Sequence, residues 1–237
     1  PEEGEVITHT IKPLEKDKDK PKQFIAFDSE DDSAGHVTIV NFYNGKYHTT
    51  FHCEQGDDYL ERGTEWMLEQ ALTKNTVFVA HNLEYDLTNL LRWCNWAPIE
   101  QMVYASRLIV ATLVGRKGVE LWDSFNLYPA PLKALAEVVR MKKGDYEEAR
   151  ADMEHNVEYC RSDCEILWTF MEKFQQMVRE GVGVSCRPTI GSTAMLAFRK
   201  NFVQFPIPAI STDFMLEAYY GGRTEAFVLD EVGEVVV

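Results

Sequence analysis

Short apolar runs bounded by polar stretches predict β-strands along the first half of the chain. Residues 24–27 (Phe-Ile-Ala-Phe) end in a polar cluster, as expected of a buried strand. Residues 36–43 and 46–53 flank Asn44-Gly45, and this dipeptide between two strand-like runs predicts a β-hairpin. Later strands are predicted at residues 76–80, 102–113 and 118–122.

Apolar residues recur with helical spacing in the stretches between and after these strands. Helices are predicted at residues 57–73, 84–93, 131–140, 151–180, 190–199 and 212–218. The order of hairpin, helix, strand, helix, strand and helix predicts an α/β fold with a mixed central sheet flanked by helices. The last part of the chain differs, with a proline-interrupted stretch at 205–210, a turn at 219–222 and strand-like stretches at 226–229 and 235–237.

The chain of 237 residues, 45% of them hydrophobic, can bury the core of one large domain, with or without a small appendage. Residues 1–22 carry a run of alternating charges and are predicted to form a tail or linker. The main domain is predicted at 23–180, and a connecting segment at 181–237. Because the sequence stops inside the strand-like stretch 235–237, we expect the parent protein to continue.

The net charge of −14 argues against broad, non-specific binding of duplex nucleic acid. An acidic chain could still approach phosphate through bound cations, which change the local sign of the charge. No stretch of about 18 apolar residues predicts a membrane span, and the N-terminus has no secretory signal pattern.

The cysteines are five in number and scattered, which predicts free thiols and an intracellular, reducing compartment. They are Cys53, Cys94, Cys160, Cys164 and Cys186. Cys160 and Cys164 lie four apart, on one face of a predicted helix. No second Cys or His pair has zinc spacing, so we expect two thiols packed beside a helix and no zinc site.

Asp28 and Glu30 alternate with Ser29 where the first strand ends, so both carboxylates should point to one face of the sheet. Such a pair could be no more than two solvated acids. Its place at the carboxyl end of a central strand, where α/β sheets hold their ligands, favours a site. Mg²⁺ and Mn²⁺ prefer oxygen ligands of this kind.

Asp86 follows the predicted strand 76–80 and lies in the first turn of the next helix. A carboxylate there is also explained by helix capping and the helix dipole. Asn82 could cap the same helix or contact a nucleotide, and Tyr85 could belong to the core or stack on a base.

Tyr159 and Asp163 share one helix face, one turn apart, although a surface tyrosine beside an acid would give the same spacing. Together with Asp28, Glu30 and Asp86, this face would gather four carboxylates from three separate segments. Two divalent cations held by such a cluster could activate water and stabilise the leaving oxygen in a displacement at phosphorus.

At these residues the sequence resembles the DEDDy 3′→5′ exonucleases, the proofreading group with a ribonuclease H-like fold. The three motifs occur in order as Asp28-Ser29-Glu30, residues 82–86 and Tyr159-x-x-x-Asp163. The resemblance implies two divalent cations, Mg²⁺ or Mn²⁺, and an attacking water oriented with the help of Tyr159. The implied metal ligands are Asp28, Glu30, Asp86 and Asp163.

A narrower resemblance, from residue 23 to 227, is to the protein-primed family-B DNA polymerases of phages and linear plasmids. Residues 81–86 look like their second exonuclease motif, and residues 123–125 like their single-strand-binding motif, with Phe125 in place of leucine. Residues 143–146 look like their catalytic-lysine motif, in which the lysine contacts substrate phosphate. Residues 219–222 look like the Tyr-x-Gly-Gly element that joins exonuclease and polymerase domains and binds DNA.

Plainer explanations stay open for these shorter motifs. Lys143 could be an ordinary solvated lysine of the basic stretch 140–143, and residues 221–222 could simply permit a turn. If the resemblance holds, Lys143 assists catalysis. The implied DNA-binding residues are then Asn82, Tyr85, Ser124, Phe125, Tyr219, Gly221 and Gly222.

The resemblance implies hydrolysis of single-stranded DNA from its 3′ end, with release of nucleoside 5′-monophosphates. The polymerase signatures Asp-x-x-Ser-Leu-Tyr-Pro and Tyr-x-Asp-Thr-Asp are absent from the sequence, so we expect no polymerisation. The expected partners are a DNA 3′ end, the parent polymerase domain and a basic partner such as a terminal protein, with no membrane. The alternatives are a free-standing DEDDy ribonuclease or exonuclease, against which 219–222 argues, and a non-catalytic interaction module.

Overall fold

The computed structural model describes residues 10–14, 19–70, 75–91, 99–104, 107–113, 120–149 and 151–207. The chain divides into two compact units, Leu14–Asn201 and a second unit made of Pro1–Pro13 and Phe202–Val237. In the second unit, Ile11 and Ile207 form an antiparallel bridge. The elements predicted after residue 207, with Tyr219, Gly221 and Gly222, lie outside the described residues. The domain boundaries at residues 22 and 180 stay predictions.

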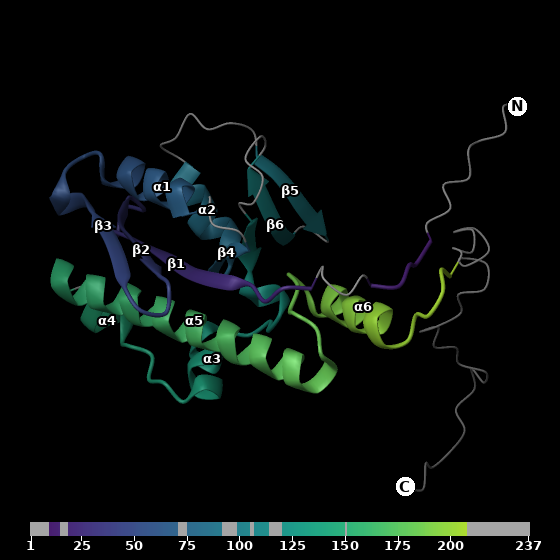
Figure 1. Ribbon diagram of the computed structural model, residues 1–237. Helices are drawn as coiled ribbons and strands as arrows, with labels where there is room; N and C mark the ends of the chain where they lie inside the picture. Colours follow the sequence, from purple (N-terminus) through teal and green to yellow (C-terminus); the bar gives the residue numbers. More distant parts are fainter. Residues whose placement is uncertain are drawn as a thin grey trace, which may run out of the picture. The chain divides into compact units, whose positions relative to one another are not determined.

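The larger unit is built on one mixed sheet, and its described strands follow the order β3-β2-β1-β4-β7-β6-β5 (Figure 1). Strands β1, β4 and β7 are parallel, and the other neighbouring pairs are antiparallel. The strands are β1 (Gln23–Asp31), β2 (Val37–Tyr43), β3 (His48–His52), β4 (Thr76–Ala80), β5 (Ile99–Tyr104), β6 (Arg107–Leu113) and β7 (Glu120–Asp123). The predicted mixed α/β architecture is confirmed.

Helices cover both faces of this sheet (Figure 1). The described helices are α1 (Tyr59–Gln70), α2 (Leu83–Leu91), α3 (Leu132–Val139), α4 (Tyr146–Ala149), α5 (Met153–Val182) and α6 (Ile190–Asn201), with 3₁₀ turns η1 (Cys53–Gln55) and η2 (Ser124–Asn126). Side chains of α1 and α2 pack with Ile25 and Phe27 of β1. Side chains of α3 and α5 pack with Phe24 and Ala26. The alternation of β1 therefore divides the core into two layers.

The prediction of one strand at 102–113 is wrong, because the chain reverses there and forms the antiparallel pair β5 and β6. Tyr104 pairs with Arg107 across the reversal, and in the sequence the polar residues Ser106 and Arg107 interrupt the apolar run there. The hairpin at Asn44-Gly45 is confirmed, but its second strand starts at His48. The Asn44 side chain accepts hydrogen bonds from the two backbone amides that precede His48, which makes a longer turn.

Helix α5 is bonded to the sheet through side chains that reach backbone groups of β1 and β2. Trp168 Nε1 donates to the Phe24 carbonyl at 3.1 Å, and Cys160 Sγ donates to the Asp28 carbonyl at 3.5 Å. Between them, Cys164 Sγ donates to the Asn41 carbonyl of β2 at 3.4 Å. These bonds set which residue of α5 lies beside which residue of β1.

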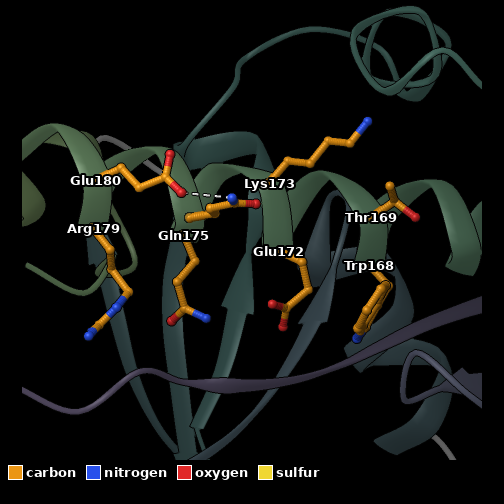
Figure 2. Close-up of a pocket in the computed structure, with 8 residues that line it drawn as sticks. Trp168, Thr169, Glu172, Lys173, Gln175, Arg179 and Glu180 are labelled. Atoms are coloured by element: carbon orange, nitrogen blue, oxygen red, sulfur yellow. Dashed lines mark hydrogen bonds between the residues drawn. The ribbon is translucent and has the colours of Figure 1, made fainter.

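A second attachment lies near the other end of α5, where Gln175 forms two hydrogen bonds with the backbone of Lys22, at 2.7 and 3.0 Å. Figure 2 shows Trp168, Glu172 and Gln175 pointing to one side of α5, while Lys173 points to the other. The Gln175 bonds fasten the helix to the residue just before β1, so the helix is held along the length of the strand.

None of the helices in the described part of the chain is both long enough and apolar enough to cross a membrane. The described cysteines are free thiols, as the sequence predicted, and Cys94 lies outside the described residues.

Candidate metal centre

The alternation of β1 separates the side chains of the first acidic motif. Asp28 and Glu30 continue the row of Phe24 and Ala26, which faces α5. Ser29 points to the opposite face, where its backbone and hydroxyl groups meet α2. Antiparallel pairing with β2 carries β1 on to Asp31, so both acids lie within the strand and not just beyond it.

Asp28 and Glu30 lie at the centre of a group of possible metal ligands. One ligand atom from each of Asp28, Glu30 and Cys160 lies within 4.8 Å of the others. Oxygen Oδ2 of Asp28 and Oδ1 of Asp163 are buried without a hydrogen-bond partner. Buried oxygens without partners are costly, and coordination of a cation would satisfy them. The residues present therefore fit a divalent cation.

The electrostatics of the group agree with this fit. Burial, followed by the charges of Glu30 and Asp163, raises the pKa of Asp28 well above its usual value. Burial, and then the charge of Asp163, raises the pKa of Glu30 to about 7. Burial also raises the pKa of Asp163, against the effect of Lys143. Carboxylates crowded in this way need positive charge to ionise together.

Positive charge is supplied from the segment between α3 and α4. Lys143 forms an ion pair with Asp163, and its Nζ lies 4.4 Å from the centre of the Tyr159 ring. Tyr146 packs edge-on against the same ring, with 6.0 Å between ring centres. Gly144 lies under it, where an added Cβ would come within 3.0 Å of the ring. The structure thus brings Lys143, Tyr159 and Asp163 together.

A cavity of about 780 Å³ opens beside this cluster. Its lining includes Lys133, Lys142, Lys143, Tyr146 and Tyr159. The lining is of mixed charge, because Glu137, Asp145 and Glu148 also belong to it, and Lys143 is the lysine that reaches the carboxylates.

Asp86 approaches from α2 and is 2% exposed. Its Oδ1 accepts hydrogen bonds from the Ser29 amide at 2.9 Å and the Ser29 hydroxyl at 2.7 Å. Asn89 donates to the same hydroxyl at 3.1 Å. Burial, and then the charge of Asp28, raises the pKa of Asp86 well above its usual value. Asp86 is therefore coupled electrically to the group, although it is outside the set within 4.8 Å.

The predicted DNA-binding residues that the structure describes follow the ends of β4 and β7. Asn82 has a left-handed backbone, with φ of 72°, and its amide donates to Asp123 Oδ1 at 2.9 Å. The amide of Phe125 donates to the same oxygen, so one buried carboxylate shapes both turns. Ser124 is fully buried and shares a hydrogen bond of 2.9 Å with His81.

Tyr85 is 43% exposed on α2, so its ring can be reached from solvent. Ser124 by contrast has no exposed surface, and the neighbouring ring of Phe125 packs 5.6 Å from that of His81. The DNA contacts of Asn82, Tyr85, Ser124 and Phe125 stay predictions.

Sequence reasoning missed the supporting residues of this centre. Ser29 is the middle residue of the first motif, and alternation alone would have turned it toward α2. Asn89 is three residues after Asp86, and Cys160 is three residues before Asp163, so helical spacing placed each beside a predicted ligand. Asp123 closes β7 at the edge where β1 and β4 also end.

Part of the sequence is similar to a family of DNA polymerases. Residues 140–236 match the family model described as DNA polymerase type B, organellar and viral. No curated protein matches the sequence. The predicted resemblance to family-B polymerases is confirmed.

Solved structures of Phi29 DNA polymerase have a similar fold at 16% sequence identity. The post-translocation complex with primer-template DNA gives a TM-score of 0.55 over 76% of this chain and 35% of the polymerase chain. The complex with single-stranded DNA gives a TM-score of 0.54 over 74% of this chain and 34% of the polymerase chain. The ternary complex gives a TM-score of 0.54 over 76% of this chain and 34% of the polymerase chain. The chain spans about a third of the polymerase that it matches. The likeness confirms the predicted ribonuclease H-like α/β fold.

Proposed function

We propose that this chain is the metal-dependent 3′→5′ exonuclease region of a family-B DNA polymerase. It would hydrolyse single-stranded DNA from the 3′ end and release nucleoside 5′-monophosphates. One observation carries the proposal, the gathering of Asp28, Glu30 and Asp163, in which an oxygen of Asp28 and one of Asp163 are buried without a hydrogen-bond partner. Asp86 is coupled to them from the other side of β1.

The comparisons support DNA as the substrate. The family match at 140–236 includes Lys143, Tyr159 and Asp163, which form one contact cluster in the fold. The Phi29 polymerase structures were solved with single-stranded and primer-template DNA. If the chain comes from a polymerase of this kind, DNA synthesis by that polymerase would be primed by a protein.

Asp28, Glu30, Asp86 and Asp163 would hold two divalent cations, Mg²⁺ or Mn²⁺. When bound, such cations make water a strong nucleophile and neutralise charge on a phosphoryl group. The phenol of Tyr159 would orient the attacking water, since its ring is fixed between Lys143 and Tyr146. The ammonium of Lys143, which lines the cavity beside Tyr159, would contact the scissile phosphate.

The end of the DNA strand would lie across the edge where β4 and β7 end. There the exposed ring of Tyr85 can stack on a base, and Asn82 lies at the surface of the turn. Ser124 and Phe125 would form the wall behind them, and Tyr219, Gly221 and Gly222 would hold the strand farther from the cut. With a net charge of −14, the chain should grip DNA by these local contacts. Because few of them come from Lys or Arg, the affinity should fall only gently with salt.

Digestion of an oligonucleotide labelled at its 5′ end tests the proposal. With Mn²⁺ or Mg²⁺ the labelled product should shorten stepwise from the 3′ end, and a chelator should stop it. Asp28→Ala/Glu30→Ala should slow digestion by at least ~10²-fold, the usual cost of lost transition-state electrostatics.

The matched control replaces two exposed acids one turn apart on α1, as Glu61→Ala/Glu65→Ala, which should digest DNA at the parent rate. If the site variant cuts as fast as this control, the metal-site assignment is wrong. A preference for RNA over DNA of the same sequence would instead favour a free-standing ribonuclease.

A further inference from the structure

A thiol lies among the carboxylates of the proposed centre. Cys160 is fully buried, and its Sγ is within 4.8 Å of ligand oxygens of Asp28 and Glu30. It precedes Asp163 by three residues on α5, so both side chains lie on the same helix face. The spacing of the cysteines gave no hint of this, because the other members come from β1.

A second observation is that two carboxylate oxygens of this group are buried without a hydrogen-bond partner. Asp163 is 5% exposed, and its Oδ1 has no hydrogen-bond partner although Oδ2 pairs with Lys143. Oδ2 of Asp28 is also buried and unsatisfied. Asp163 lies near enough that its charge raises the pKa of both Asp28 and Glu30. The unsatisfied Oδ2 belongs to a residue whose ligand oxygen lies within 4.8 Å of the Cys160 thiol, and that thiol donates to the Asp28 carbonyl.

Different cations would use these atoms differently. Mg²⁺ and Mn²⁺ prefer oxygen and would leave the sulfur unused. Zn²⁺ takes thiolate sulfur at about 2.3 Å and carboxylate oxygen at about 2.0–2.2 Å in a tetrahedral site. Cd²⁺ is softer still and favours sulfur. One cysteine and two carboxylates supply a mixed set of this kind.

We propose that thiophilic divalent cations, Zn²⁺ and Cd²⁺, bind this centre with Cys160 Sγ as a direct ligand beside Asp28 and Glu30. On binding, the thiol loses its proton to the buffer and the sulfur forms a coordinate bond, with no change of oxidation state. The centre would thereby hold these cations more tightly than oxygen ligands alone allow. The inference uses carboxylates of the proposed function, and it predicts that Zn²⁺ displaces Mn²⁺ and stops digestion.

Cys164 is the matched comparison. It lies one turn farther along α5, is also fully buried, and donates to the Asn41 carbonyl at 3.4 Å. It is not a member of the group within 4.8 Å. Cys53 is exposed, so its replacement shows whether a surface thiol binds the added cation.

The test is titration of the whole protein with Cd²⁺, followed by the ultraviolet sulfur-to-cadmium charge-transfer band. The parent, Cys164→Ser and Cys53→Ser should develop the band with one equivalent and release a proton. Cys160→Ser should lose the band, and its Kd for Cd²⁺ should rise by at least ~10-fold, since even outer-shell changes cost 10–100-fold. A band that persists in Cys160→Ser, or that vanishes in Cys53→Ser, overturns the proposal.

X-ray absorption of the parent protein with one equivalent of Zn²⁺ is a second test. It needs no variant, so it does not depend on whether Cys160→Ser folds. A sulfur neighbour at about 2.3 Å is expected, and a shell of oxygen and nitrogen alone would refute the ligand. This result can be told apart from a failure of the proposed function, because a protein that never digests DNA could still show the sulfur-to-cadmium band. Conversely, if the protein digests DNA with Mn²⁺ but Zn²⁺ has no sulfur ligand, the proposed function is supported and Cys160 as a metal ligand is refuted.

Discussion

Replacing Glu30 with glutamine should stabilise the cation-free protein, and the gain should grow as the pH rises. Burial, and then the charge of Asp163, raises the pKa of Glu30 from 4.5 to about 7. Between these values the native protein keeps a proton that the unfolded chain has lost. Stability falls with pH wherever the native state binds more protons. The penalty is therefore absent below about pH 4.5 and complete above about pH 7.

The size of this penalty follows from the interval between the two pKa values. At about 1.4 kcal/mol per pH unit, the step from 4.5 to about 7 corresponds to about 3 kcal/mol. Glu30 is only 9% exposed, so solvent screens it little. Glutamine has nearly the same shape and no charge, so Glu30→Gln should recover most of this free energy at high pH and little at low pH.

Urea unfolding in the presence of a chelator, followed by circular dichroism at about pH 5 and about pH 8, measures the effect. The gain in the free energy of unfolding should be roughly 2 kcal/mol larger at the higher pH. Glu158→Gln, which changes an exposed acid on α5, should show no such difference. If Glu30→Gln gives the same gain at both pH values, Glu30 is not the crowded, buried carboxyl described above.

Two further changes test the packing around the site. Ser29→Ala removes a hydroxyl that donates to Asp86, and should lower the free energy of unfolding in urea by ~1–3 kcal/mol. The exposed Ser33→Ala should stay within ~0.5 kcal/mol, and equal effects would contradict the buried hydrogen bond. Gly45 has φ of 87°, and a Cβ added there would lie 2.1 Å from the indole ring of Trp168. Gly45→Ala should therefore lower the free energy of unfolding by ~2 kcal/mol or more in the same assay. Gly181→Ala on α5 meets open space and should instead stabilise by ~0.5–1 kcal/mol, and a loss there as large as at Gly45 would refute the steric argument.

Local periodicity predicted those parts of the site that depend on one element. Alternation alone turns Asp28 and Glu30 to the same side, and helical spacing alone aligns Tyr159 with Asp163. The meeting of these two pairs depends on how α5 lies across β1, which follows from bonds between distant residues. Helical spacing places Cys160 on the face of Asp163, but no local pattern could show that its thiol meets Asp28 and Glu30 of β1.

The strand prediction failed at 102–113 for a related reason. Ser106 and Arg107 interrupt the apolar run between β5 and β6, but Ala105-Ser106 is not one of the dipeptides that signal a two-residue hairpin. The hairpin at Asn44-Gly45 was found because its turn residues interrupt the pattern. Sequence reasoning thus located turns that carry their own chemistry and overlooked a reversal that does not.

The bonds between α5 and the first strand also limit how this chain can change in length. Gln175, Trp168 and Cys160 each contact a fixed backbone position on or beside β1. One residue inserted between them would rotate the rest of the helix by about 100° and advance it by about 1.5 Å, breaking the contacts on one side. Insertions should be tolerated in the exposed turn before β2 but not between Cys160 and Gln175, so related proteins that keep the site should differ in loop length while this stretch stays the same length.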